Sequence, residues 1–158
     1  MKKNIIFYVI IGAIVVFGIA LDMITKHITM GVNTPIIEGV VSAIFTWNTG
    51  AGWSILSDQT LLLTIFSAIL VIGLILLIIF YRPQNTLFSV GTGLVLAGAI
   101  GNLIDRIVFG AVRDFIHLDF MSFPIFNVAD ILLTFGAIIM GVWLVFFWGK
   151  KGKKENGK

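Results

Sequence analysis

The sequence predicts a mostly α-helical integral membrane protein with four transmembrane helices and a small set of extracytoplasmic β-strands. Of its 158 residues, 58% are hydrophobic and 12% are charged, and the mean hydropathy is +1.06. A typical soluble domain has about 25% charged residues, so this composition indicates a membrane protein. Four apolar runs approach or reach the roughly 20 residues that a helix needs to cross a bilayer. We therefore predict one membrane-embedded domain that comprises residues 1–158.

The predicted spans are residues 5–21, 61–80, 87–104 and 131–148. The first span is the shortest, and a cleaved signal peptide is the alternative for it. Two lysines precede the run, and Gly18-Ile-Ala20 has the small residues of a cleavage site. We favour a span, because the run is longer than a typical signal core. Asp22 and Lys26 follow it one helical turn apart and can form an ion pair at its outer end.

The basic residues predict how the spans are oriented. Eight of the eleven lysines and arginines lie before the first run, in the turn between the second and third runs, and in the tail 149–158. Positively charged flanks stay in the cytoplasm, so both termini are expected there and residues 22–60 and 105–130 are expected outside. The basic tail also suits anionic headgroups, which makes membrane lipids an expected partner.

The segment between the first two spans has a different composition and predicts short strands. Residues 31–59 are rich in Gly, Thr, Asn and Pro and contain two short runs of β-branched and aromatic residues. The predicted strands are residues 35–41 and 44–48. Asn48-Thr-Gly50 then begins a loop in which glycine lets the backbone approach a ligand closely. Trp47 and Trp53 suit the membrane interface, and a plain interfacial turn is the alternative for this loop.

Small residues four positions apart in the third span predict close packing against another helix. Gly93, Ala97 and Gly101 form this stripe, and Asp105 lies next on it. Asp105 is therefore expected to face the packed side of the bundle, where Asn102 and Arg106 flank it.

Acidic residues concentrate in residues 98–130, which hold four of the eight in the chain: Asp105, Asp114, Asp119 and Asp130. This stretch includes a mixed loop, residues 107–126, which is expected to contain a short interfacial helix or strand. Ionisable groups near a membrane are costly unless they are paired or hydrated, so a hydrophobic protein that concentrates them is expected to use them. The sequence thus predicts an active site at one face of the membrane.

A pair of these carboxylates is the strongest candidate for chemistry. Two acids held close together share a proton, and the pKa of one rises, so the pair supplies a base and an acid at the same pH. The base takes a proton from water while the acid polarises a carbonyl group, which is peptide hydrolysis of the aspartic type. Spacing alone leaves two alternatives open, metal binding by the same acids and structural salt bridges with Arg106 and Arg113.

Other chemistries have little support in the sequence. The absence of cysteine excludes disulfides, a thiol nucleophile and thiolate metal sites. His27 and His117 are not part of an HExxH motif, and Ser122 with His117 is a weak candidate for a nucleophile and base. We therefore expect no metal, no cofactor and no nucleic-acid partner. The main alternative function is a small membrane carrier or proton-coupled transporter that uses the carboxylates as relays, although the second and fourth spans have almost nothing polar at their centres.

Five short motifs follow one another along the chain. They are Asp22-x-x-x-Lys26, Asn48-x-Gly50-Ala, Gly101-Asn102-Leu-Ile-Asp105-Arg106, Val112-x-Asp114-Phe115 and Phe126-Asn127-x-Ala129-Asp130. In this order they resemble the motifs of lipoprotein signal peptidase, also called signal peptidase II, and the resemblance covers essentially the whole chain.

This resemblance implies an aspartic endopeptidase in the bacterial cytoplasmic (inner) membrane, with its active site on the extracytoplasmic side. The enzyme would remove the signal peptide from a diacylglyceryl-modified prolipoprotein by cutting before the lipid-modified cysteine. We expect it to act as a monomer without a cofactor. A non-enzymatic factor that binds lipoproteins is a third candidate, and it would tolerate the loss of either acid of the pair.

The resemblance also implies roles for individual residues. Asp114 and Asp130 match the catalytic pair, and residues 31–59 resemble the small extracytoplasmic sheet platform of the family. Asp105 matches a structural position in its motif. The positions that match supporting or substrate-binding residues are Asp22, Lys26, Asn48, Gly50, Asn102, Asp105, Arg106 and Asn127.

Four positions depart from the pattern expected for the family. Arg113 precedes the first catalytic acid where a small apolar residue is common, and a nearby cation would lower the pKa of a carboxylate. Gly52-Trp53 replaces a commoner Ala-Phe, and Ile131 replaces a frequent Ser. None of these changes removes a carboxylate.

The two remaining acids of the central stretch are expected to be structural or unimportant. Asp105 adjoins Arg106 at the end of a packed stripe, so it is expected to stay ionised and to hold structure. Asp119 lies among apolar residues on a loop, where nothing in the sequence fixes it against a partner.

Overall fold

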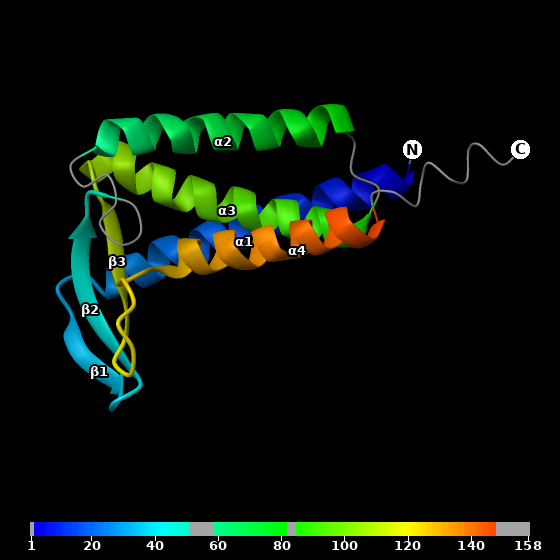
Figure 1. The fold of residues 1–158 in the computed structure, drawn as a ribbon. Helices are drawn as coiled ribbons and strands as arrows, with labels where there is room; N and C mark the ends of the chain where they lie inside the picture. Colours follow the sequence, from blue (N-terminus) through cyan, green and yellow to red (C-terminus); the bar gives the residue numbers. More distant parts are fainter. Residues whose placement is uncertain (1, 51–58, 82–84, 148–158) are drawn as a thin grey trace, which may run out of the picture.

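The computed structural model describes residues 2–50, 59–81 and 85–147. Within these residues the chain forms four long helices and one three-stranded sheet (Figure 1). In chain order the elements are α1 (Lys2–Ile28), β1 (Asn33–Ile37), β2 (Val41–Asn48), α2 (Thr60–Tyr81), α3 (Thr86–Phe109), β3 (Val112–Leu118) and α4 (Val128–Phe147). The predicted class, a mostly helical membrane protein with a small sheet, is confirmed.

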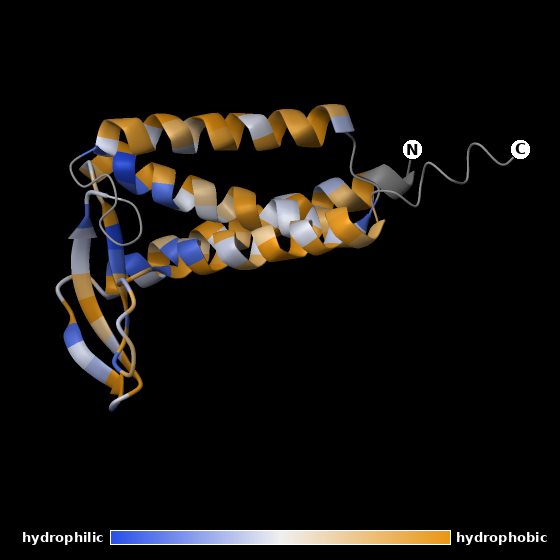
Figure 2. Cartoon of the chain, viewed as in Figure 1, coloured by the Kyte–Doolittle hydropathy of each residue, from blue (hydrophilic) through white to orange (hydrophobic). Residues whose placement is uncertain are grey.

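All four helices are long and apolar enough to cross a membrane. The helix α3 is the central one, because most of its surface is buried between α1 and α4, whereas α2 leaves nearly all of its surface exposed. Hydrophobic residues cover the helices, and hydrophilic residues gather where α1, α3 and α4 meet the sheet (Figure 2). The buried charged side chains of the described residues therefore lie at one end of the bundle and not at its middle.

Glycines allow α3 to lie close to both neighbouring helices. A Cβ atom built on Gly101 would lie 2.5 Å from Oδ2 of Asp22 on α1, and one on Gly98 would collide with the backbone oxygen of Ala129 on α4. Gly18 of α1 faces Ala97 in the same way, at 2.8 Å. Small residues in α3 thus pack it against α1, as the sequence indicates, and a second set packs it against α4.

The first and third helices extend further than the predicted spans. The helix α1 continues through Asp22 to Ile28, and α3 continues through Asp105 to Phe109. The charged side chains of Asp22, Lys26 and Asp105 are fully buried against one another, so their charges do not end the helices.

The sheet has the order β1-β2-β3 with antiparallel neighbours. The first predicted strand is wrong at its end, because residues 38–40 form the turn between β1 and β2, where Gly39 adopts a positive φ of 71°. Of the two options for residues 107–126, a strand is correct, and it is β3. The strands run roughly perpendicular to the helices and project from one end of the bundle (Figure 1).

Candidate active site

Asp114 lies on β3, where its side chain is 2% exposed. Its Oδ2 atom accepts a hydrogen bond of 2.8 Å from Nδ2 of Asn48 on the neighbouring strand β2. Its Oδ1 atom accepts a bond of 2.6 Å from Nδ2 of Asn127, just before α4. Two carboxamides from distant parts of the chain therefore fix both oxygens of this carboxylate.

Asp130 lies in the first turn of α4 and is fixed by a capping box. The side-chain oxygen of Asn127 accepts from the backbone N–H of Asp130 at 2.9 Å, and Oδ2 of Asp130 accepts from the backbone N–H of Asn127 at 3.1 Å. The other carboxylate oxygen accepts a bond of 2.8 Å from Nδ2 of Asn102 on α3. The Asn-x-x-Asp spacing therefore caps the start of α4 and fixes the orientation of the Asp130 carboxylate.

Asn127 connects the two acids, because it bonds to Asp114 through its side chain and to Asp130 through both its backbone and its side chain. It is fully buried, and its Nδ2 atom also lies 3.1 Å from Oδ1 of Asn102. The structure thus brings together the two acids and the three asparagines that the sequence singles out, Asn48, Asn102 and Asn127.

Burial raises the pKa of Asp114 from its ordinary value to about 7, and the negative charge of Asp130 contributes to the rise. The net shift of this pKa is upward even though the preceding residue, Arg113, carries a positive charge. Successive residues of a strand point to opposite faces, and the guanidinium of Arg113 is turned toward Asp105. Asp114 can therefore hold a proton close to neutral pH.

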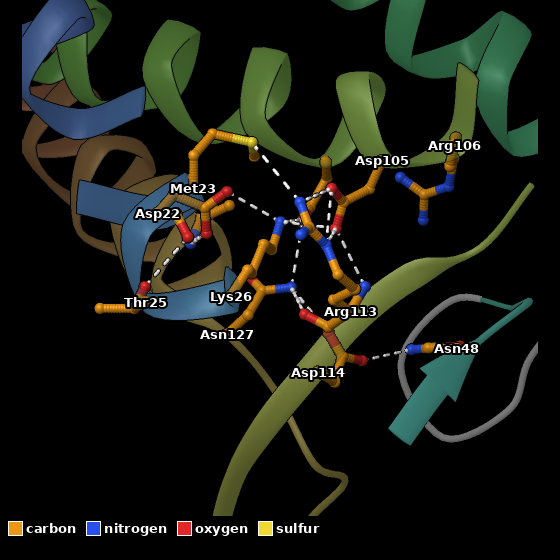
Figure 3. A network of polar contacts seen from close by, with 12 residues as sticks. Asp22, Met23, Thr25, Lys26, Asn48, Asp105, Arg106, Arg113, Asp114 and Asn127 are labelled. Carbon is orange, nitrogen blue, oxygen red and sulfur yellow. Dashed lines mark hydrogen bonds and ion pairs between the residues drawn. The ribbon is translucent and has the colours of Figure 1, made fainter. Parts of the chain in front are cut away.

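A buried ion network lies beside Asp114 (Figure 3). Nζ of Lys26 lies 2.8 Å from Oδ2 of Asp22 and 3.2 Å from Oδ2 of Asp105, and it donates to Oδ1 of Asn102 at 2.9 Å. Nη2 of Arg113 lies 2.7 Å from Oδ1 of Asp105. The Asp22–Lys26 pair forms in the last turns of α1, as the sequence indicates, and both side chains are fully buried there.

Asp22 also ties α1 to the start of α4, because its Oδ1 atom accepts a bond of 2.9 Å from the backbone N–H of Ala129. This contact holds the first turn of α4, which carries Asp130, against the ion network. Asp22 and Lys26 thus lie behind the pair of acids and do not face the cavity described below.

Of the salt bridges left open as an alternative, the one between Asp105 and Arg113 forms, whereas the guanidinium of Arg106 points away from Asp105. Its guanidinium lies 3.4 Å from both Oγ of Ser67 on α2 and the backbone oxygen of Gly50. Ser67 gives no signal in the sequence, since it stands alone in an apolar run. Arg106 and Gly50 both lie on the cavity, whereas Asp105 is enclosed by Lys26 and Arg113.

A cavity of about 500 Å³ opens beside the two acids. Apart from Thr134, its polar lining residues are ones predicted from the sequence to belong to the site, and the remaining lining is apolar. The lining residues are Asn48, Gly50, Asn102, Arg106, Val112, Asp114, Leu118, Phe123, Pro124, Ile125, Phe126, Asp130, Ile131, Thr134 and Phe135. The sequence did not indicate the wall formed by residues 123–126, because that wall depends on how the segment after β3 folds back along the strand, where Ile116 bridges Phe126.

Asp119 has fixed partners, contrary to the sequence-based expectation. Its Oδ2 atom accepts a bond of 2.8 Å from Oγ of Ser42, and its Oδ1 atom lies 2.9 Å from Nδ1 of His117. These bonds lower the pKa of Asp119. The contacts join β2 to the end of β3 and do not involve the cavity. His117 therefore bonds to Asp119, and Ser122 is an exposed residue.

Within residues 2–50, 59–81 and 85–147, no three His, Asp or Glu side chains lie close enough to hold a metal ion. The acids of the site instead bond to amide and cationic donors. Gly52 and Trp53, two of the positions that depart from the expected pattern, lie outside the described residues.

Comparison with known proteins identifies the family. The family model described as signal peptidase (SPase) II matches residues 14–146. The chain is 37% identical to lipoprotein signal peptidase from Enterococcus faecalis over 99% of this chain and 97% of that one. It is 39% identical to the protein of the same name from Geobacillus thermodenitrificans over 92% of both chains.

Solved structures agree with the sequence relatives. A bacterial membrane enzyme determined by the in meso method at 2.3 Å resolution superposes with a TM-score of 0.82 and 34% identity, covering 89% of this chain and 90% of that one. A second, at 1.9 Å resolution, has a TM-score of 0.78 and 34% identity, covering 87% and 93%. The motifs, the fold and these relatives agree, and the chain therefore belongs to the signal peptidase II family of proteases.

Proposed function

We propose that this protein is an aspartic endopeptidase that removes the signal peptide from diacylglyceryl-modified prolipoproteins, with Asp114 and Asp130 as the catalytic pair. It would cut before the lipid-modified cysteine at the outer face of the bacterial cytoplasmic membrane. The observation that carries the proposal is the shared contact of Asn127 with both acids at the edge of the cavity. This contact holds two carboxylates in one place, where burial favours keeping a proton on Asp114.

The proposed chemistry needs one proton shared by the pair. The ionised carboxylate takes a proton from water, whose oxygen bonds to the scissile carbonyl carbon, while the protonated carboxyl gives its proton to the carbonyl oxygen. As the C–N bond then breaks, the acid that gave up its proton takes one from a hydroxyl of the diol, and the other acid gives its proton to the leaving nitrogen, so the pair again holds one proton. Arg106 lies on the same cavity and can stabilise negative charge on the substrate oxygens.

The cavity also supports the proposed substrate class. Acids lie on one side, and aromatic and aliphatic side chains line the other, among them Phe135 of α4, which is 58% exposed. Because α4 is long and apolar enough to span the membrane, an exposed apolar residue on it faces lipid. A lipid-bearing peptide could thus reach the acids from the bilayer. All residues of the site come from one chain, so we expect the monomer to be active.

Cleavage of a defined substrate tests the proposal. Purified protein in lipid vesicles is given a diacylglyceryl-modified prolipoprotein and, separately, the same prolipoprotein without the lipid. We expect the modified substrate to be shortened and the unmodified one to remain intact. If neither substrate is cut, the proposed activity is wrong, and equal cleavage of both would refute the lipid requirement.

The carrier alternative is not favoured. The named relatives are lipoprotein signal peptidases. Asp114 lies on the sheet and Asp130 in the first turn of α4, whereas carriers usually place such groups near the middle of the membrane. A non-enzymatic binding factor would not require a buried carboxylate that keeps a proton near neutral pH.

Topology gives a first prediction. We expect the termini in the cytoplasm and the sheet outside, because basic residues flank the other end of the bundle. A cysteine introduced at the exposed Thr34 of β1 should react with an impermeant thiol reagent in intact cells, and one at Lys3 or Lys154 should not. The opposite labelling pattern would put the acids on the cytoplasmic side and contradict the proposal.

Inhibitor sensitivity gives a second prediction. If two carboxylates and water hydrolyse the bond, then metal chelators and serine- or thiol-directed reagents should leave kcat/KM unchanged. The measurement is cleavage of the modified substrate before and after treatment, with a zinc protease as a control for the chelator. Loss of activity on chelation and its recovery with a divalent ion would contradict the aspartic mechanism.

The pH dependence gives a third prediction, based on the pKa of about 7 at Asp114. Above this pH the pair loses its shared proton, so kcat/KM should fall about tenfold per unit. In the folded state Asp114 binds a proton between its ordinary pKa and 7 that the unfolded chain has lost, so folding stability should also decrease as pH rises through this window. Asp114→Asn should remove that decrease, and an unchanged pH dependence of the melting temperature would contradict the assignment.

A further inference from the structure

Arg113 is a buried cation beside the catalytic pair that does not face the cavity. Its side chain is 7% exposed, and its Nε atom lies 3.2 and 3.3 Å from the two oxygens of Asp105. Its backbone N–H also donates to Asp105, at 3.0 Å. The guanidinium contacts Sδ of Met23 at 3.6 Å and lies 4.7 Å from the ring centre of Phe109. Arg113 thus occupies both oxygens of Asp105 in a forked arrangement that lysine cannot reproduce.

This contact connects Arg113 to the catalytic pair through three further side chains. Asp105 also binds Lys26, Lys26 donates to the amide oxygen of Asn102, and the amide nitrogen of Asn102 donates to Asp130. The charge of Lys26 requires the oxygen of Asn102 to face it, which leaves the nitrogen for Asp130. Lys26 therefore orients the donor that binds a catalytic oxygen, and Asp105 competes with Asn102 for this lysine.

The charges around the site balance when the pair keeps one proton. The cations are Lys26 on α1, Arg106 on α3 and Arg113 on β3; the anions are Asp22, Asp105 and the pair formed by Asp114 and Asp130. The described residues of β2 and α2 that border the site contribute only neutral groups, Asn48 and Ser67. Three cations therefore match Asp22, Asp105 and a single negative charge on the pair.

We propose that Arg113 is a positioning residue that sets the charge balance of this site: by occupying Asp105 it leaves Lys26 bound to Asn102 and favours one proton on the catalytic pair. Without Arg113, Asp105 would have Lys26 as its sole cation, and Lys26 would be drawn away from Asn102. The site would also gain net negative charge, so the pair would hold its shared proton more tightly and up to a higher pH. This inference rests on the proposed function of Asp114 and Asp130.

The test compares Arg113→Gln, which keeps an N–H donor but removes the charge, with Arg113→Lys, which keeps the charge. We expect Arg113→Gln to move the alkaline limb of kcat/KM upward by about half a pH unit or more, as loss of a nearby cation does. Its kcat should fall about tenfold or more, because Asn102 is less well oriented, with KM little changed. Arg113→Lys should keep the wild-type limb although it melts at a lower temperature.

If Arg113 has only a structural role, both variants would have a lower melting temperature, and the alkaline limb of kcat/KM would stay at the wild-type pH. This result would overturn the inference. If Arg113→Gln does not fold, the double variant Asp105→Asn/Arg113→Gln is used instead. It loses one anion and one cation, so the net charge of the site is unchanged. This double variant should have the wild-type limb, and an upward shift of half a unit would contradict the charge-balance mechanism.

A failure of this inference can be distinguished from a failure of the proposed function. The pH dependence of the melting temperature, compared between each variant and the same variant with Asp114→Asn, reports the proton on Asp114 without any substrate. An upward shift in Arg113→Gln without cleavage by the wild-type protein would support the inference and refute the activity. Cleavage by the wild-type protein with no shift in either readout would refute the inference alone.

Discussion

Asp114→Asn and Asp130→Asn should each reduce kcat by about four orders of magnitude or more, and the double substitution should be no worse than either single one. Both acids are needed to activate water and to protonate the carbonyl oxygen, so loss of one leaves the other without its counterpart. Asparagine has nearly the shape of aspartate, so insertion into the membrane should be normal. The measurement is cleavage of the modified prolipoprotein by each variant at equal amounts of folded protein.

Asp119→Asn is the matched control for this result. It makes the same chemical change in the same stretch of chain, but its contacts with Ser42 and His117 lie away from the cavity. We expect it to remain active. Substantial turnover by Asp114→Asn or Asp130→Asn would show that this pair does not share the catalytic proton, and inactivity of Asp119→Asn would show that the sheet contributes more than support.

Asp105→Asn should cause a large loss of stability, about 3–5 kcal/mol, because removing one partner from a buried ion pair leaves the other charge uncompensated. Asp105 is fully buried and binds two cations, Lys26 and Arg113, so its neutral form would leave both without their shared anion. We expect less folded protein in the membrane and a lower melting temperature. Thermal unfolding of the purified protein in one detergent measures the effect.

Asp119→Asn is again the control, because it makes the same chemical change at an exposed position. The side chain of Asp119 is exposed enough for water to replace its bonds, so its loss should lower the melting temperature by much less. If Asp105→Asn has the same melting temperature as the wild-type protein, the buried ion network does not stabilise the bundle. If it is stable but inactive, Asp105 belongs to the chemistry and not to the scaffold.

The sequence predicts the helices well, because membrane spans depend on composition over about 20 residues, which a single chain displays directly. It also brings Asn127 and Asp130 together, since residues three apart at the start of a helix share a face, and here they form a capping box. The stripe of Gly93, Ala97 and Gly101 correctly indicates the packed side of α3, because close helix contact requires small residues.

Spacing indicates an ion pair within one helix, as for Asp22 and Lys26, but it does not reveal partners on different elements. Asp105 adjoins Arg106 in the sequence, yet it pairs with Arg113, because adjacent residues of a helix point in different directions and β3 returns past the end of α3. Asp119 gains Ser42 through the pairing of β2 with β3, which sequence spacing does not reveal. The aromatic wall of the cavity has the same origin, since it depends on the fold of the segment after β3.

The most direct test of the central claim is mass analysis of the products from one diacylglyceryl-modified prolipoprotein incubated with the wild-type protein, Asp114→Asn or Asp130→Asn in lipid vesicles. The wild-type protein should release two fragments from a single cut before the modified cysteine, and both variants should return intact substrate. A cut at another bond, or the same fragments from either variant, would contradict hydrolysis by this pair of carboxylates.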